Sequence, residues 1–423
     1  MAKRKNSTLF DTADVIGGTP GNDSLVGTAG NDTINGGGGH DEIEGLGGND
    51  RLFGDGGHDV ITGGGGTDRL EGGGGDDILY GDDGNRGDTL VGGLGDDYYE
   101  IDRGDVVIEA AGEGSDTLGV NFSYTLANGS AIEGLQTFYE GVDLTGNSGD
   151  NRLFSIGGNS ELRGKAGDDY LFVEQGEGNL LFGNVGNDWL VADTGYASGV
   201  LRGGLGDDSY VLFNMEENST IQVIENAGEG TDTVYSYWNA TLRDNLENLV
   251  LLDPFLSADG SVLEGRGNQL ANRIVSQTDD DYSADLYGMG GNDYLQGQDG
   301  VGTHFYGGGG RDQFYLSSEL TWGWDDERHQ TIHDFKHGTD EILLDSEEFA
   351  NIGPDGALAA NAFYSASGAG AVAQTADHRV IYDSDSGALY YDPDGTGAQE
   401  QTLFVYLGDQ SIGGLDATDI VVV

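Results

Sequence analysis

The chain has no cysteine and only four prolines among its 423 residues. Without cysteine it forms neither disulfides nor a thiolate metal site, so a thin core needs another stabiliser. Basic residues are also scarce, because 18 Lys and Arg stand against 75 Asp and Glu, for a formal net charge of -57. This charge repels nucleic acid and anionic lipid, so we expect neither as a partner, and it makes cations the expected ligands.

Long apolar segments are missing as well. The tightest aliphatic cluster, Leu249–Leu252, is too short to cross a membrane, so no transmembrane segment is expected. The opening Met1–Phe10 begins with basic residues, but Asp11 and Asp14 interrupt the apolar stretch that an N-terminal export signal requires. If the protein leaves the cell, we expect it to do so without a cleaved N-terminal signal peptide.

Glycine is abundant, with 78 residues, and from Gly18 onward it recurs in a nine-residue pattern. Nine consecutive units run to about residue 100, one of them with two extra residues. The fourth position is always glycine, and the eighth is aliphatic until Tyr99 closes the series. The sixth position is aspartate throughout: Asp23, Asp32, Asp41, Asp50, Asp59, Asp68, Asp77, Asp88 and Asp97. Such regularity predicts a repeat architecture.

Each position of the unit has a physical role. Glycine permits the positive φ angles of a tight loop, the loop directs carbonyl oxygens inward, and the aspartate adds a hard anionic oxygen. Oxygen-only ligands suit Ca²⁺ better than zinc or copper. The last three residues are expected to form a short strand whose middle side chain points inward, and two facing units would close a coil of 18 residues. The expected carbonyl ligands include Gly36, Gly39, Gly54, Gly57, Gly63, Gly66, Gly72 and Gly75.

One buried aliphatic side chain per nine residues does not offset the entropy lost when a glycine-rich backbone is ordered. Ca²⁺ that binds only the folded state would supply the difference. We therefore expect the chain to be disordered without calcium.

The unit Gly-Gly-x-Gly-x-Asp-x-aliphatic-x resembles the RTX (repeats-in-toxin, haemolysin-type) calcium-binding repeat. This resemblance implies an all-β fold, a right-handed parallel β-roll or β-helix solenoid with several Ca²⁺ ions held between its glycine loops.

The repeats fall into blocks. We expect a lead-in (1–17), a first roll (18–100), a spacer (101–154), a second block (155–211), a spacer (212–282), a third block (283–316) and a C-terminal cap (317–423). The spacers contain near copies of one run, Glu109–Leu118 and Glu225–Val234, and are expected to continue the solenoid with wider coils. The later blocks carry fewer predicted ligands, with Ser160 in an aspartate position: Asp169, Asp188, Asp208, Asp293 and Asp312.

The C-terminal region brings aromatic residues and less glycine. The segments Thr331–Asp345 and Tyr382–Gly397 resemble the end cap of serralysin-type RTX proteins. Asp419–Val423 resembles the acidic-then-hydrophobic ending of type I secretion substrates. The resemblance implies an ABC exporter as a partner and an extracellular location.

Two motifs imitate active sites. The run His329–His333 falls one residue short of a zinc-protease helix motif, because Gln330 replaces the general-base glutamate. Its β-branched centre predicts a strand, in which the two histidines do not form a helical pair. The acidic run Asp279–Asp281 resembles a glycosidase carboxylate pair, but in so acidic a chain solvated or calcium-binding carboxylates are favoured. We predict no catalytic residue.

Two functions remain open. The first is a secreted calcium-binding exoprotein with a structural, matrix or adhesion role, in contact with extracellular polysaccharide or a cell surface. The alternative is an RTX-type secreted enzyme or toxin, polysaccharide-modifying or hydrolytic, with its site in the spacers or the C-terminal region.

Overall fold

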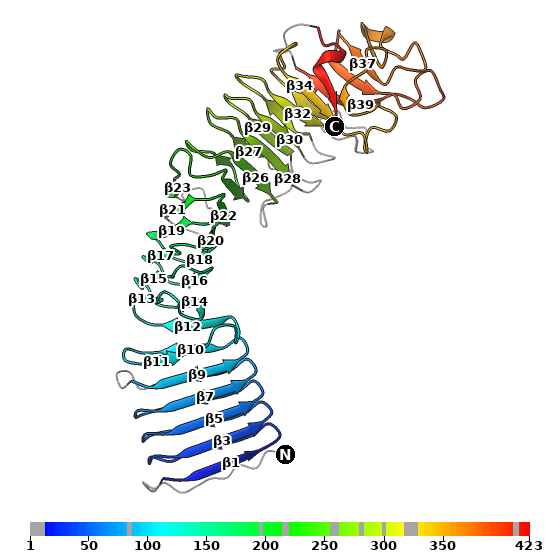
Figure 1. The fold of residues 1–423 in the computed structure, drawn as a ribbon. Coiled ribbons are helices and arrows are strands. Elements are labelled where there is room, and N and C mark those ends of the chain that lie inside the picture. Colours follow the sequence, from blue (N-terminus) through cyan, green and yellow to red (C-terminus); the bar gives the residue numbers. More distant parts are fainter. Residues whose placement is uncertain are drawn as a thin grey trace. The chain divides into compact units, whose positions relative to one another are not determined.

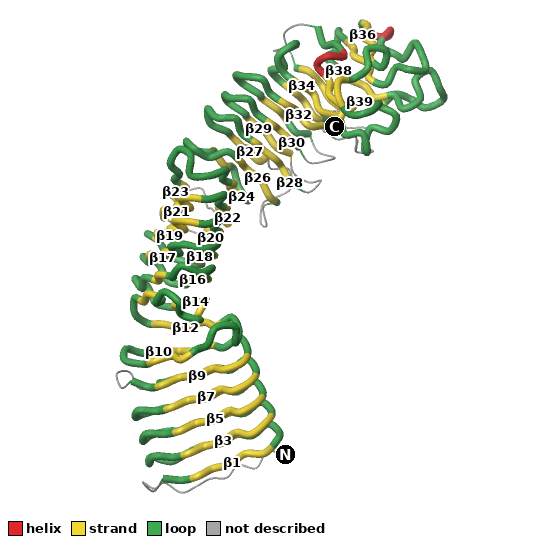
Figure 2. The backbone as a smooth tube through the Cα atoms, in the orientation of Figure 1, coloured by secondary structure: helices red, strands yellow, loops and turns green. Residues whose placement is uncertain are grey.

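The computed structural model describes residues 13–82, 87–193, 198–213, 220–253, 262–278, 283–297, 302–316, 329–408 and 414–423. The chain divides into two compact units, one of Met1–Asp208 with Glu216–Gln222 and one of Ser209–Met215 with Val223–Val423. Parallel strands stack as successive rungs in each unit (Figure 1). In the described ranges the only helical segments are two 3-10 turns, η1 (Gly368–Gly370) and η2 (Ala417–Asp419) (Figure 2). None of the described residues forms a helix with the length and hydropathy needed to cross a membrane.

Three sheets build the first unit. One sheet contains β1 (Val15–Thr19), β3 (Thr33–Gly38), β5 (Arg51–Gly56), β7 (Arg69–Gly74), β9 (Thr89–Leu94) and β11 (Val106–Ile108). The next sheet contains β2 (Ser24–Val26), β4 (Glu42–Glu44), β6 (Val60–Thr62), β8 (Ile78–Tyr80), β10 (Tyr98–Ile101), β12 (Asp116–Val120), β14 (Ile132–Thr137), β16 (Arg152–Ser155), β18 (Tyr170–Val173) and β20 (Trp189–Asp193). The third contains β13 (Tyr124–Thr125), β15 (Leu144–Thr145), β17 (Glu161–Arg163), β19 (Asn179–Val185), β21 (Ser198–Leu205) and β23 (Thr220–Val223).

The strand register confirms the predicted 18-residue coil. Ile34 lies opposite Leu52, and Leu52 lies opposite Leu70, each pair 18 residues apart. These eighth-position side chains are fully buried and form the core, together with those of the facing strands, such as Ile43 and Ile61. The short-strand prediction holds on one side only: β4, β6 and β8 have three residues each, whereas β3, β5, β7 and β9 have six. The longer strands continue through the glycines of the next unit.

Stacking explains why the fourth position is always glycine. Gly66 has a φ of +154°, and a Cβ atom added there would overlap the carbonyl oxygen of Gly48 in the preceding coil. The second position also has positive φ, yet Leu46 and Asp55 occupy it with φ of 75° and 71°. The fourth position is therefore closed to a side chain, whereas the second position admits one.

The first spacer continues the solenoid, as expected. Tyr99 pairs with Leu118, Leu118 with Leu135 and Leu135 with Leu153, giving coils of 19, 17 and 18 residues. These coils are no wider than those of the first roll. Wider coils occur in the second unit, where 25 residues separate Leu249 from its partner Ile274.

The second unit has two sheets. One contains β22 (Ser209–Phe213), β24 (Thr233–Ser236), β26 (Asn248–Leu252), β28 (Arg273–Gln277), β30 (Tyr294–Gln296), β32 (Gln313–Leu316), β34 (Glu341–Leu344), β35 (Gly356–Ala357) and β40 (Ile420–Val422). The other contains β25 (Ala240–Thr241), β27 (Val262–Arg266), β29 (Ser283–Tyr287), β31 (His304–Tyr306), β33 (Gln330–Ile332), β36 (Phe363–Ala366), β37 (Val380–Asp383), β38 (Ala388–Tyr391) and β39 (Thr402–Leu407).

The cap departs from the parallel pattern, since β37, β38 and β39 pair antiparallel. The run His329–His333 contains strand β33, as the sequence predicted, and its two histidines flank that strand. The acidic run Asp279–Asp281 lies outside the described residues.

Candidate calcium ladders

The sixth-position aspartates of the first roll stack into two ladders. In each ladder the main-chain N–H of one residue donates to Oδ1 of the carboxylate one coil further on, mostly at 2.7–2.9 Å. One ladder contains Asp23, Asp41, Asp59, Asp77, Asp97 and Asp116. The other contains Asp14, Asp32, Asp50, Asp68, Asp88 and Asp105. Each aspartate thus orders its neighbour's backbone through one oxygen.

The second oxygen of most ladder carboxylates is buried without a hydrogen-bond partner. This holds for Oδ2 of Asp41, Asp50, Asp59, Asp77, Asp97, Asp116, Asp169, Asp188, Asp293 and Asp312. A buried ionised oxygen without a partner is costly, and native structures rarely tolerate it. A row of such atoms would be stabilised by cations bound at these carboxylates.

The space in front of these oxygens fits a cation. A Cβ atom added at Gly45 would lie 2.5 Å from Asp50 Oδ2 and 2.5 Å from the carbonyl oxygen of Gly63 in the next coil. A carboxylate oxygen and a carbonyl oxygen therefore converge on a space that the first-position glycine leaves open. This hard, oxygen-only donor set is the kind that Ca²⁺ prefers.

Seven of the eight predicted carbonyl ligands, all but Gly66, divide into two groups. Those of Gly36, Gly54, Gly63 and Gly72 face the open space beside the first-position glycine of the preceding coil. Those of Gly39, Gly57 and Gly75 face the fourth-position glycine of the following coil. The structure brings the first group together with the aspartate oxygens.

Burial perturbs the ladder carboxyls strongly. Desolvation raises the pKa of Asp77 to about 7 and that of Asp169 to about 8, although a backbone N–H bonded to each opposes the shift. Neighbouring carboxylates add to the rise. A bound cation would remove this penalty, because it replaces the lost water and neutralises the charge of the neighbouring carboxylates.

The first member of each predicted series differs from the rest. Asp32 Oδ2 accepts hydrogen bonds from Thr28 N–H at 2.6 Å and from Thr28 Oγ1 at 2.9 Å. Asp23 Oδ2 accepts the same pair from Thr19, and Asp23 is only partly buried. At both levels the second-position threonine already donates to the oxygen that has no partner elsewhere, so ligation by these two aspartates remains a prediction.

The second and third blocks have one aspartate ladder each. Asn151 N–H donates to Asp169, which continues to Asp188 and Asp208. In the second unit, Asn272 donates to Asp293, which continues through Asp312 to Asp340. On the other side of the second block, Ser160 N–H donates to Asn179 instead of an aspartate. Asparagine keeps the hydrogen bond but brings no charge, in line with fewer ions in these blocks.

The sequence pattern missed several ladder members. Asp105, Asp116, Asn151, Asn272 and Asp340 occupy ladder positions, but they lie outside regular nonapeptides. For the asparagines, a glycine five residues earlier was a usable signal: Gly146 and Gly267 precede Asn151 and Asn272 at that spacing, as Gly36 precedes Asp41.

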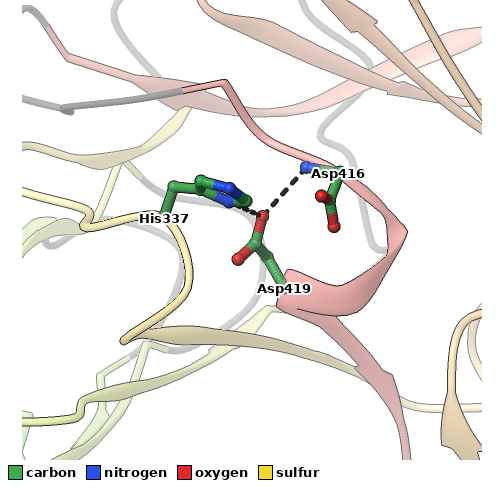
Figure 3. A group of neighbouring side chains, drawn as sticks. All are labelled: His337, Asp416 and Asp419. Carbon is green, nitrogen blue, oxygen red and sulfur yellow. Dashed lines mark hydrogen bonds and ion pairs between the residues drawn. The ribbon is translucent and has the colours of Figure 1, made fainter.

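A separate acidic cluster anchors the last strand (Figure 3). Asp419 Oδ2 lies 2.7 Å from His337 Nδ1 and accepts the Asp416 N–H at 2.9 Å, while Oδ1 accepts the Gly338 N–H at 2.8 Å. The hydrogen bond to Asp419 raises the pKa of His337. With both Asp419 oxygens engaged, the cluster serves as a capping box for η2, directly before β40.

Comparison with known proteins agrees with the ladders. The RTX calcium-binding nonapeptide repeat matches four segments, residues 17–52, 53–87, 145–180 and 267–301. Over 80 residues the chain is 38% identical to the endo-1,3-1,4-beta-glycanase ExsH of Rhizobium meliloti (strain 1021). That alignment covers 19% of this chain and 16% of the glycanase, so the chain spans only a small part of that relative. The chain thus carries RTX calcium-binding nonapeptide repeats, and they lie in a parallel β-solenoid with aspartate ladders.

Proposed function

We propose that this protein is a secreted exoprotein whose solenoid folds when Ca²⁺ fills its ladders outside the cell, and that its role there is structural, in a matrix or in adhesion. The observation that carries the proposal is the row of buried Oδ2 atoms without partners. A carbonyl of the next coil faces the same open space at five of them: Asp41, Asp50, Asp59, Asp77 and Asp293. Such a row is unfavourable without cations and favourable with them.

Calcium acts here through linkage. The unfolded chain does not bring a carboxylate of one coil next to a carbonyl of another, so it offers no comparable site. Ions bound by the folded state alone stabilise that state by mass action. They also reduce the repulsion that a formal charge of -57 imposes on a compact chain.

The placement of β40 supports export before folding. Asp419–Val423 is the segment that resembles a type I secretion ending, and in the folded protein Ile420 and Val422 are buried in β40, which pairs with β34. An exporter would therefore meet this segment only in an unfolded chain. Low cytosolic calcium keeps RTX sites of the extracellular class empty, since such sites have Kd values of about 10⁻⁴–10⁻³ M.

A polar cavity in the second unit favours polysaccharide as a partner. It has a volume of about 460 Å³ and is lined by Arg273, Gln277, Gln296, Tyr315 and Glu348, among others. Guanidinium, amide and phenol groups suit sugar hydroxyls. Among the lining residues that the structure describes, Glu348 has the one carboxylate, whereas glycoside hydrolysis normally uses two. The cavity thus favours binding over cleavage, and catalysis by the secreted chain stays the second candidate.

Calcium-driven folding tests the proposal. Far-UV circular dichroism of the full chain in chelator should show coil, and millimolar Ca²⁺ should produce the β spectrum. The same concentration of Mg²⁺ serves as the control and should leave most of the chain unfolded, because Mg²⁺ demands octahedral geometry and gives up its water reluctantly. A chain that is equally rich in β structure in chelator would refute calcium-dependent folding.

A further inference from the structure

The first roll ends with an arrangement that the nonapeptide pattern does not contain. Tyr99 takes the eighth, core-facing position in place of an aliphatic residue and is fully buried. Its hydroxyl donates a hydrogen bond to the carboxylate of Glu109, which directly follows β11. The hydroxyl thereby holds a spacer residue against the last coil of the roll.

Three carboxylates converge at this point. One oxygen each from Asp97, Glu109 and Asp116 lies within 4.8 Å of the others. Asp97 and Asp116 are 2% and 1% exposed, and the Oδ2 atom of each has no hydrogen-bond partner. Because Ca–O distances are about 2.3–2.6 Å, two oxygens on one ion are separated by up to about 5 Å, so a single ion can contact all three carboxylates.

The donors here differ from those of a ladder site. A Cβ atom added at Gly92 would collide with Asp97 Oδ2 and with the Tyr99 hydroxyl, and no carbonyl of a following coil is among its nearest atoms. At Gly45, by contrast, the space is shared by one aspartate and the carbonyl of Gly63. Side-chain carboxylates thus replace the missing glycine loop. The ladder also stops here, since Asp116 N–H donates to Glu133 at 2.9 Å instead of to another aspartate.

The arrangement recurs in the second unit. Tyr210 is fully buried, and its hydroxyl donates to Glu225 as Tyr99 donates to Glu109. Asp232 follows Glu225 by seven residues, as Asp116 follows Glu109, and its N–H donates to Glu247 at 2.9 Å. The tyrosine–glutamate bond and this spacing thus occur in both copies of the duplicated run, which argues against a chance contact.

We propose that Asp97, Glu109 and Asp116 bind a Ca²⁺ ion of their own, which closes the first roll and fills at lower calcium concentration than the ladder sites. The inference rests on the proposed function, because it concerns the same solenoid and the same ion. Three carboxylates bring more negative charge than one carboxylate with carbonyls, and ligand charge raises Ca²⁺ affinity. The bound ion ties the spacer's Glu109 to Asp97 of the roll and to Asp116 of the next coil.

The test compares full-length Glu109→Gln with Glu44→Gln. Glu44 is an exposed strand residue of the same roll, so its substitution makes the same charge change away from the cluster. Equilibrium dialysis and native mass spectrometry should show one Ca²⁺ fewer per chain in Glu109→Gln, with the tightest binding step weakened about tenfold or more. Glu44→Gln should match the wild type.

Terbium provides a second readout. Tb³⁺ replaces Ca²⁺ at oxygen sites, and its extra charge favours the three-carboxylate cluster. At one equivalent of Tb³⁺, tyrosine-sensitised emission should appear in the wild type and in Glu44→Gln, because the Tyr99 hydroxyl contacts the ligand Glu109. Glu109→Gln should lose most of this emission.

The outcomes separate the two proposals. If the wild type binds Ca²⁺ while Glu109→Gln and Glu44→Gln have the same stoichiometry and the same first step, the separate site is refuted and the calcium-folded solenoid stands. If the wild type binds no Ca²⁺, both fail. Should Glu109→Gln not fold in 10 mM Ca²⁺, Glu109→Asp keeps the charge on a shorter side chain. That variant should bind the full number of ions with a weakened first step, and an unchanged first step would refute the site.

Discussion

Replacing Asp59 in the middle of the first ladder should raise the calcium concentration needed for folding far more than replacing Asp23 at its edge. Asp59 has two separate tasks in the structure. Its Oδ1 accepts the main-chain N–H of Asp41 at 2.7 Å, and its buried Oδ2 faces the open space beside Gly54. Asp23 is partly exposed, and its Oδ2 is already engaged by Thr19.

The magnitude follows from these two tasks. Asp59→Ala removes a charged ligand and leaves the Asp41 N–H buried without an acceptor, which costs about 1–3 kcal/mol in addition to the lost ion. Asp59→Asn keeps an acceptor for that N–H and loses only the charge. The alanine variant should therefore be less stable than the asparagine variant by about 1–3 kcal/mol, whereas Asp23→Ala should cost less than about 1 kcal/mol.

The assay is a calcium titration of the full chain followed by far-UV circular dichroism, with urea unfolding at saturating calcium for the free energies. Because each coil stacks only on its neighbours, a defect in the middle interrupts the array on both sides. The calcium midpoint should be highest for Asp59→Ala and lower for Asp59→Asn. It should be lowest for Asp23→Ala, close to the midpoint of the wild type. Equal midpoints for Asp59→Ala and Asp23→Ala would show that the sites are independent and would refute the ladder reasoning.

Three further predictions test other parts of the structure. Gly66→Ala should lower the free energy of unfolding by about 3 kcal/mol or more in urea unfolding, because its Cβ atom would overlap the carbonyl of Gly48 in the preceding coil. Gly56→Ala is the control: it has open space around it and should cost about 1 kcal/mol or less. Burial raises the pKa of Asp77 to about 7 in the ion-free roll, above its unfolded value, so protonation stabilises the fold as the pH falls below 7. The calcium midpoint for folding should therefore be lower at pH 6 than at pH 8. Asp419 raises the pKa of His337, so the stabilisation from this pair is fully present below the unfolded pKa near 6.5 and is lost as the pH rises through the folded pKa. Hydrogen exchange of the β40 amides, corrected for intrinsic rates, should therefore be faster at pH 8 than at pH 6. His337→Ala should abolish this difference.

The repeat pattern was enough to predict most of the fold. A period of nine with glycine at the fourth position and an aliphatic residue at the eighth was enough to predict parallel stacking, the 18-residue coil and the buried rows through Ile34 and Ile43. It also predicted which aspartates lie in the ladders, because a side chain repeated at the coil period must stack on itself. The strand at β33 followed from β-branched residues in the same way.

Other features depended on contacts that no local pattern encodes. The cluster at the end of the roll unites Asp97, Glu109 and Asp116 through a tyrosine at a core position, although the duplicated run that contains Glu109 was visible in the sequence. The burial of β40 against β34 joins residues about 80 positions apart.

The sequence by itself determined the class of ligand, the period and the identity of the ladder, because those depend on residue type and spacing within a unit that copies itself. The tertiary structure alone decided which carboxylate oxygens stay open, where each ladder ends and which spacer residues join it. These depend on what the neighbouring coil supplies, such as the carbonyl of Gly63 or the carboxylate of Glu109, and that neighbour is set by stacking and not by adjacency in the chain.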